Sequence, residues 1–130
     1  MWDPRVLVET NHYNWTGDPQ VVLPRLAGKG AWMVDLFSGA GGFSVGLGSS
    51  GFRPLLCVDI HRPSVETYSK NHPGTGTILG DIRKVDDRTI SNVIGRREVS
   101  LVTAGVPCQG FSLCNRKRWA QDERNFLFLE

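Results

Sequence analysis

Four short apolar segments of this chain each lead into a residue that can carry chemistry, and this repeated arrangement constrains the fold more than any other feature. Three of these residues are acidic, Asp35, Asp59 and Asp81, and the fourth is Cys108. Each lies at or just past the end of its segment, and apolar runs of this length suit buried strands. Ligands of parallel α/β sheets bind beyond the carboxyl ends of the strands. We therefore expect a ligand site where these four residues meet.

Apolar strand patterns alternate with helical patterns from Ala31 onward. Helical stretches of about ten residues between the strands favour right-handed crossovers and a parallel sheet, so the sequence predicts an α/β fold. Residues 1–30 contain Trp and Pro but only one short apolar stretch, and we expect an irregular N-terminal extension there. The strands are expected at 32–37, 54–59, 75–79 and 99–104, and the helices at 43–50, 61–71 and 88–94.

The composition excludes several classes of protein. No apolar run approaches the ~20 residues of a membrane-spanning helix and no signal peptide is evident, so no membrane partner is expected. Three cysteines at irregular spacing argue against a disulfide framework and favour an intracellular location. Cys108 and Cys114 have no histidine close by, so no metal site is predicted. The net charge of +2 is compatible with a nucleic-acid partner.

A glycine-rich turn joins the first predicted strand to the first helix. Gly39, Gly41 and Gly42 would let a ligand approach the backbone closely, and the N–H groups of the next helix favour an anion. The anion could be a dinucleotide pyrophosphate or the carboxylate of an amino-acid-like ligand such as S-adenosylmethionine. The full dinucleotide motif needs glycine where this chain has Ser44. A purely structural turn is the third interpretation.

Two acids follow the glycine turn at the ends of the next two strands. Asp59 comes twenty positions after Gly39, where an acid can accept hydrogen bonds from ribose hydroxyls. Asp81 is placed to accept from an adenine amino group, and Ile60 and Ile82 could sandwich the ring. Each acid alone is equally well explained as a solvated strand end or a helix N-cap. Together, and after a glycine turn, they favour an adenosine site.

Cys108 follows the fourth strand, beside the predicted adenosine site. A nearby cation or helix N-terminus would lower the pKa of this thiol and raise its nucleophilicity. Free cysteine is more often a small buried hydrophobe, which is the interpretation that we apply to Cys57 and Cys114. The position of Cys108 at the ligand edge makes it a candidate nucleophile.

Four features of the chain resemble motifs of the DNA cytosine-5 methyltransferases. Residues 35–44 (DLFSGAGGFS) are similar to the first motif of that family, and residues 106–112 (VPCQGFS) to its catalytic Pro-Cys motif. Asp59 and Asp81 fall where the family keeps its ribose and adenine contacts. Residues 122–124 are similar to the segment after the mobile catalytic loop. The matches cover nearly three quarters of the chain in the family's order.

The resemblance implies a Rossmann-like fold of S-adenosylmethionine-dependent methyltransferases, with duplex DNA as partner and a role in DNA methylation and restriction-modification. In this family a cysteine thiolate adds to C6 of a flipped-out cytosine, which activates C5 toward the methyl group. Cys108 would be this nucleophile, and Pro107 would shape the turn that presents it. The cofactor-binding residues would be Asp35, Phe37, Ser38, Gly39, Gly41, Gly42, Asp59, Ile60, Asp81 and Ile82. The DNA-binding residues would be Gln109, Ser112, Arg116, Lys117, Arg118 and Arg124, although a short basic run is also common in solvated loops.

The family's later motifs are absent from these residues. The Glu-Asn-Val tripeptide, whose carboxylic acid assists at cytosine N3, does not occur among the 130 residues. We therefore expect residues 31–130 to be the N-terminal portion of a catalytic domain with an incomplete sheet. Alone it would be poorly stable and inactive. It could be one subunit of a split methyltransferase, whose complementary C-terminal polypeptide supplies the rest, or a truncated reading frame, or a fragment of a longer protein. The alternatives are a tRNA cytosine-5 methyltransferase and a non-catalytic S-adenosylmethionine-binding regulatory fragment, while Ser44 disfavours an NAD-binding domain.

Overall fold

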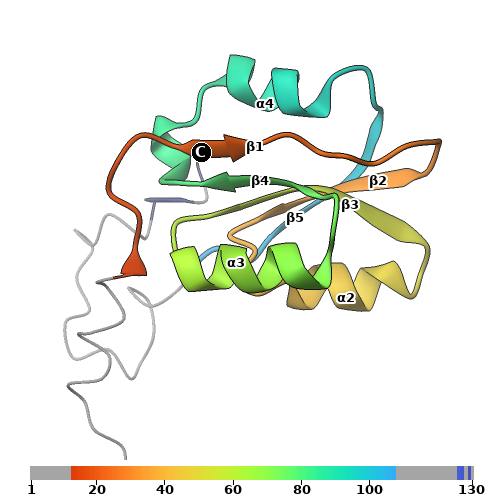
Figure 1. Cartoon of the computed structure of the whole chain (residues 1–130), viewed down its shortest axis with the longest axis horizontal. Helices are drawn as coiled ribbons and strands as arrows, with labels where there is room; N and C mark the ends of the chain where they lie inside the picture. The colour runs from red at the N-terminus through yellow and green to blue at the C-terminus, as the bar shows by residue number, and fades with distance from the viewer. Residues whose placement is uncertain (1–12, 108–125, 128, 130) are drawn as a thin grey trace, which may run out of the picture.

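A single mixed sheet organises the protein (Figure 1). The computed structural model describes residues 13–107, 126–127 and 129. Within these residues the sheet has five strands in the order β1-β4-β3-β2-β5. The strands are β1 (Gln20–Val22), β2 (Ala31–Leu36), β3 (Phe52–Asp59), β4 (Gly76–Leu79) and β5 (Val99–Ala104). The helices are α2 (Gly42–Gly48), α3 (Arg62–Asn71), the 3₁₀ helix η2 (Ile82–Lys84) and α4 (Asp87–Ile94).

The predicted parallel α/β sheet is confirmed. β3 pairs in parallel with both β2 and β4, and β2 pairs in parallel with β5. The ends of the predicted strands and helices differ from the observed ends by two residues at most. Pro54, which has no backbone N–H, lies in β3 ahead of the stretch that pairs with β4, beginning at Leu56. The missing donor therefore costs no hydrogen bond on the β4 side.

The expectation of an irregular extension through residue 30 is wrong for Gln20–Val22. These residues form β1, which pairs antiparallel with β4 and places Val21 opposite Ile78. An unpaired β4 edge would leave a row of N–H and C=O groups without partners, and an extended segment close by satisfies them. A three-residue strand is too short to show an alternating apolar pattern that could be recognised in the sequence. It is stabilised by its pairing with the β4 edge that it covers.

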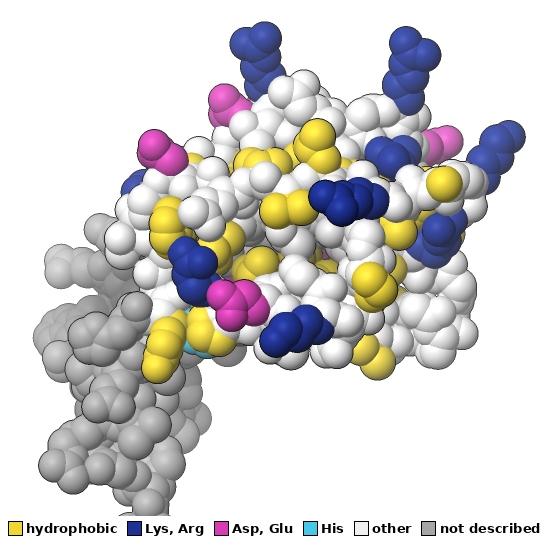
Figure 2. Space-filling model, viewed as in Figure 1, with side chains coloured by type: hydrophobic (Ala, Val, Ile, Leu, Met, Phe, Trp, Pro, Cys, Tyr) yellow, Lys and Arg dark blue, Asp and Glu magenta, His cyan; other side chains and the backbone are white. Residues whose placement is uncertain are grey.

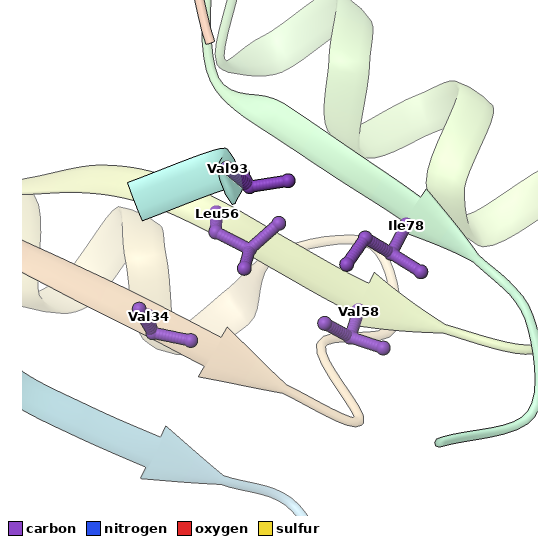
Figure 3. Close-up of a cluster of buried hydrophobic side chains, with 5 residues drawn as sticks. All are labelled: Val34, Leu56, Val58, Ile78 and Val93. Carbon is purple, nitrogen blue, oxygen red and sulfur yellow. The ribbon is translucent and has the colours of Figure 1, made fainter. Parts of the chain in front are cut away.

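Helices cover both faces of the sheet. In Figure 1, α4 lies above the sheet and α2 and α3 lie below it. The face toward α4 holds a cluster of buried side chains that alternate along their strands (Figure 3). Its members are Val34, Leu56, Val58, Ile78 and, from α4, Val93. On the other face α3 buries Val65 and Tyr68. Because β2, β3, β4 and β5 run parallel, their carboxyl ends lie together at one end of the sheet, between the two layers of helices.

On one face of the molecule, the described residues carry their positive charge in separate places. On the face shown in Figure 2, Lys and Arg side chains stand apart, with hydrophobic side chains between them. The described residues therefore form no single basic patch on that face. Among the helices of the described residues, none has the length and apolar character to cross a membrane.

Candidate functional site

A cavity of about 550 Å³ lies at the carboxyl ends of the parallel strands, where the sequence predicts a ligand site. This volume is typical of sites for small molecules and cofactors. The predicted site residues that line it are Phe37, Asp59, Ile60, Asp81, Ile82 and Pro107. The other lining residues are Asn14, Val58, His61, Gly80, Arg83, Gly105 and Leu127. The fold thus brings together residues from the loops after four different strands.

Asp59, the last residue of β3, connects the glycine turn to the loop after its own strand. Its Oδ2 accepts a hydrogen bond from the backbone N–H of Gly39 at 2.8 Å, and its Oδ1 accepts from the N–H of His61 at 2.8 Å. A carboxylate offers about four acceptor positions. Each oxygen therefore keeps capacity for a further donor from the cavity, such as a ribose hydroxyl.

Asp81 lines the cavity, but Arg83 already engages its carboxylate. Arg83 Nη2 lies 2.6 Å from Oδ2, and Nε lies 3.0 Å from Oδ1. The backbone N–H of Arg83 also donates to Oδ1 at 3.0 Å, as expected for an acid that caps a helix. The hydrogen bond from the Arg83 side chain is the main cause that lowers the pKa of Asp81. An adenine amino group would have to share this carboxylate with the guanidinium.

Phe37 has a backbone conformation that residues other than glycine usually avoid. Its φ is 51°, and within the described residues no other non-glycine residue has a positive φ. Such a conformation costs on the order of 1 kcal/mol or more and persists only where the surroundings impose it. The surroundings here include the hydrogen bond from Gly105 N–H to the Leu36 carbonyl at 3.1 Å, which links the ends of β5 and β2. The strain at Phe37 occurs where the aromatic residue lines the cavity.

Asp35 does not reach the cavity, where the sequence predicted it. Its side chain is fully buried below the glycine turn. Oδ2 accepts from Ser44 Oγ at 2.7 Å, and Oδ1 accepts from Thr103 Oγ1 at 3.0 Å. The Tyr68 hydroxyl lies 2.5 Å from Ser44 Oγ and extends the network to α3. The carboxylate therefore ties β2 to α2 and β5, and it supports the turn from beneath.

The remaining predicted residues of the turn, Ser38, Gly39, Gly41 and Gly42, are not among the residues that line the cavity. Gly39 N–H donates to Asp59, and Gly41 N–H donates to the Ser38 carbonyl at 3.1 Å. These two donors are thus already used within the protein. Gly41 also has a structural reason to be glycine, because its φ is 101° and a Cβ there would lie 2.9 Å from His72 Nε2.

The buried Asp35 is expected to make stability depend on pH. Burial raises the pKa of this carboxyl in the folded protein above 3.8, and the hydrogen bonds from Ser44 and Thr103 offset only part of that effect. Below pH 3.8 the group is protonated in both states, so its stabilising contribution is fully present; this contribution is lost as pH rises through the raised pKa. The free energy of unfolding of the wild type, minus that of Asp35→Asn, should therefore fall across this window in denaturant titrations. A difference that stays constant or rises with pH would contradict the assignment.

The predicted nucleophile and the predicted DNA-binding residues lie outside the described residues. These are Cys108, Gln109, Ser112, Arg116, Lys117, Arg118 and Arg124. Pro107, the residue directly before Cys108, lines the cavity. Cys57 is buried, as predicted, and burial raises the pKa of its thiol to about 12. Cys57 is therefore not a nucleophile at neutral pH.

Among the residues of the cavity wall that were not predicted from the sequence, three have polar side chains. His61, which the sequence interpretation assigned to the surface by default, and Arg83 each stand two positions after an acid at a strand end. That spacing could have identified them, because they share the loops of Asp59 and Asp81. Asn14 carries no such signal, since only the folding of the N-terminal segment brings it to the cavity. Among the described residues, no three His, Cys, Asp or Glu side chains group as a metal site.

Comparison with known proteins gives consistent matches. The family model described as C-5 cytosine-specific DNA methylase matches residues 32–130. Type II methyltransferase M1.HphI of Haemophilus parahaemolyticus is 41% identical over 99 residues, which are 75% of this chain and 27% of that protein. Type II methyltransferase M.AquIA of a Picosynechococcus species is 35% identical over 100 residues, which are 75% of this chain and 40% of that protein.

A solved structure shares the fold. It is a crystal structure provisionally described as a DNA modification methyltransferase encoded within a prophage (E. coli). The two structures superpose with a TM-score of 0.63 and 29% sequence identity, over 75% of this chain and 26% of the other. The chain therefore spans well under half the length of each protein to which it is compared here.

Proposed function

The chain belongs to the C-5 cytosine-specific DNA methylase family, and we propose that it binds S-adenosylmethionine and contributes the nucleophile of a DNA cytosine-5 methyltransferase. The observation that carries this proposal is the cavity at the carboxyl edge of the sheet. Its wall holds Asp59 and Asp81 on neighbouring loops and Pro107 directly before Cys108. Pro107, which directly precedes the proposed nucleophile, thus lines the cavity in which the cofactor would bind.

The cavity has the chemistry that the adenosine part of S-adenosylmethionine requires. Asp59 would accept hydrogen bonds from the ribose hydroxyls, and Asp81, shared with Arg83, would accept from the adenine amino group. Ile60 and Ile82 offer apolar contact to the two faces of the base. When bound, the cofactor supplies an electrophilic methyl group on a sulfonium. The glycine turn would allow close approach, with Phe37 beside it.

Cys108 would provide the covalent step that cytosine needs. Carbon C5 of cytosine is a weak nucleophile, and addition of the Cys108 thiolate to C6 gives C5 the character of an enamine carbon. After C5 has been methylated, loss of its proton and elimination of the sulfur restore the aromatic ring and the free cysteine. The base must first leave the duplex stack, at a cost of about a few kcal/mol. Gln109, Ser112, Arg116, Lys117, Arg118 and Arg124 would contact the DNA, where each neutralised phosphate adds to the salt dependence of binding.

Further segments would have to complete the enzyme. The chain spans 27% of M1.HphI, and its 130 residues contain no Glu-Asn-Val tripeptide to assist at cytosine N3. Strand β5 has the apolar sequence of a buried strand (VSLVTA), yet it forms an edge of the described sheet and leaves Val102 57% exposed. We propose that a complementary C-terminal polypeptide packs beside β5 and supplies the missing acid. A DNA substrate would place the assembly inside the cell.

A methyl-transfer assay tests the proposal. The chain is mixed with a polypeptide that carries the family's later motifs, and transfer from tritium-labelled S-adenosylmethionine is measured on duplex DNA and on tRNA. Tritium is expected in duplex DNA only when both polypeptides are present, because this chain would supply the cofactor pocket and the other polypeptide would supply the N3 acid. Transfer to tRNA alone would indicate an RNA substrate. Cofactor binding without transfer to either would support a regulatory role.

A further inference from the structure

We propose that residues 13–22, here called the arm, hold Asn14 in the wall of the cofactor cavity, and that the carboxamide of Asn14 donates a hydrogen bond to the adenosine. This inference rests on the proposed function, because it concerns the same cavity. The arm lies outside residues 32–130, which the family model matches. A cofactor contact from Asn14 would therefore be an addition to the site residues that the family motifs indicate.

The arm is attached to the cavity through the loop that follows β3. The backbone N–H of Trp15 donates to the carbonyl of Ile60 at 2.8 Å. Asn14 forms an antiparallel bridge with His61. Because Ile60 and His61 directly follow Asp59, this pairing places the arm beside the proposed ribose contact. Asn14, Ile60 and His61 all line the cavity.

A second attachment holds the other end of the arm at β4. Residues 20–22 pair with β4, and Lys84 Nζ donates to the carbonyl of Thr16 at 3.1 Å. Pro19 packs on Gly80, where an added Cβ would lie 3.0 Å from Pro19 Cα. The arm therefore connects the ends of β3 and β4, the two strands that present Asp59 and Asp81.

Trp15 stiffens the arm between these attachments. Its ring nitrogen Nε1 donates to the carbonyl of Asp18 at 2.6 Å, which closes a turn within the arm. The guanidinium carbon of Arg62 lies 4.7 Å from the centre of the Trp15 ring, within the range of a cation–π contact with α3. Asn14 is thus held at the cavity by its neighbour as well as by its own backbone.

The chemistry of the cavity leaves a role for a neutral donor. The two carboxylates accept hydrogen bonds, whereas adenosine also presents acceptors, which are its ring nitrogens and ribose oxygens. The Asn14 carboxamide has two N–H donors and one acceptor. It has no hydrogen-bond partner among the described residues, and Asn14 is half-buried. Arg83, by contrast, engages Asp81, and His61 Nδ1 lies 2.7 Å from Ser64 Oγ.

Titration calorimetry of the full chain tests the inference with two probes, S-adenosylhomocysteine and methylthioadenosine. Asn14→Ala is expected to weaken both by about tenfold, since both contain the adenosine and one hydrogen bond is lost. Asn14→Asp should weaken both at least as much, because it keeps the shape but removes the donors. Gln20→Ala is the matched control, since Gln20 is an exposed arm residue outside the cavity, and it should bind as the wild type does.

The outcomes separate this inference from the proposed function. Wild-type binding that Asn14→Ala leaves unchanged would overturn the arm's role while the cofactor site stands. If Asn14→Asp binds both probes with wild-type affinity, Asn14 is not a hydrogen-bond donor to the adenosine. If Gln20→Ala and Asn14→Ala lose the same affinity, the loss comes from a loosened arm and not from a contact of Asn14, and the inference is overturned. Absence of S-adenosylhomocysteine binding by the wild type would defeat the proposed cofactor site and this inference with it.

Discussion

Cys108→Ser is expected to reduce methyl transfer by about a thousandfold or more, and this is the largest effect that we predict. A thiol with an ordinary pKa of about 8.5 provides some thiolate at neutral pH, whereas a serine hydroxyl provides essentially no alkoxide. Addition to C6 of cytosine therefore fails. The measurement is tritium transfer to duplex DNA in the presence of the complementary polypeptide. S-Adenosylhomocysteine binding should be unchanged, because the substitution leaves the adenosine contacts in place.

Trapping of the covalent intermediate gives the same prediction a direct readout. DNA that contains 5-fluorocytosine should form a persistent adduct, because the fluorine at C5 cannot leave as a proton does. Cys114→Ser is the matched control, since we interpret that thiol as inert, and it should form the adduct as the wild type does. An adduct that survives in Cys108→Ser would assign the nucleophile to another residue.

Asp59→Ala is expected to weaken S-adenosylhomocysteine binding by about a hundredfold, the second largest effect. Two hydrogen bonds to a charged acceptor contribute about 3 kcal/mol or more together, and about 1.4 kcal/mol corresponds to a factor of ten. The same change leaves the N–H groups of Gly39 and His61 without their acceptor, so the glycine turn loses its link to β3. The affinity is measured by titration calorimetry, and the folded state is checked by thermal unfolding.

Two further variants distinguish binding from folding in this experiment. Asp59→Asn preserves the side-chain volume and one carbonyl oxygen, so it should keep more affinity than Asp59→Ala. Asp87→Asn removes an exposed acid at the start of α4, away from the cavity, and should bind as the wild type does. If Asp59→Ala remains folded and binds with wild-type affinity, Asp59 is not a cofactor ligand.

Much of the fold could be predicted because its signals are local. Apolar runs of strand length and the helical stretches between them identified β2 to β5 with ends that are correct to within two residues. The start of α4 shows why the ends of helices could also be predicted. The Asp86 carboxylate caps this helix by accepting a hydrogen bond from the N–H of Thr89, three positions away, at 2.7 Å. Interactions over so few residues are encoded in the order of the residues themselves.

The roles of individual acids could be predicted only in part. The position of Asp59 and Asp81 after their strands indicated the edge of the sheet, and both line the cavity. The same reasoning failed for Asp35, because the alternation of side chains along β2 decides toward which face of the sheet each one points. On its face, the Asp35 carboxylate accepts hydrogen bonds from Ser44 and Thr103 inside the protein. A motif position does not reveal whether a carboxylate points to a ligand or into the core.

By itself the sequence determined the parallel α/β sheet, the end of the sheet at which the cavity lies and the family, since these depend on periodicity and on residues close together in the chain. Only the tertiary structure decided that Gln20–Val22 complete the sheet, that Asn14 reaches the cavity and that Asp35 is buried beneath the turn. The physical reason is that these features are contacts between distant segments. The free energy of each such contact depends on which strand edge, sheet face or hydrogen-bond donor remains unpaired in the rest of the folded chain. No short stretch of sequence carries that information.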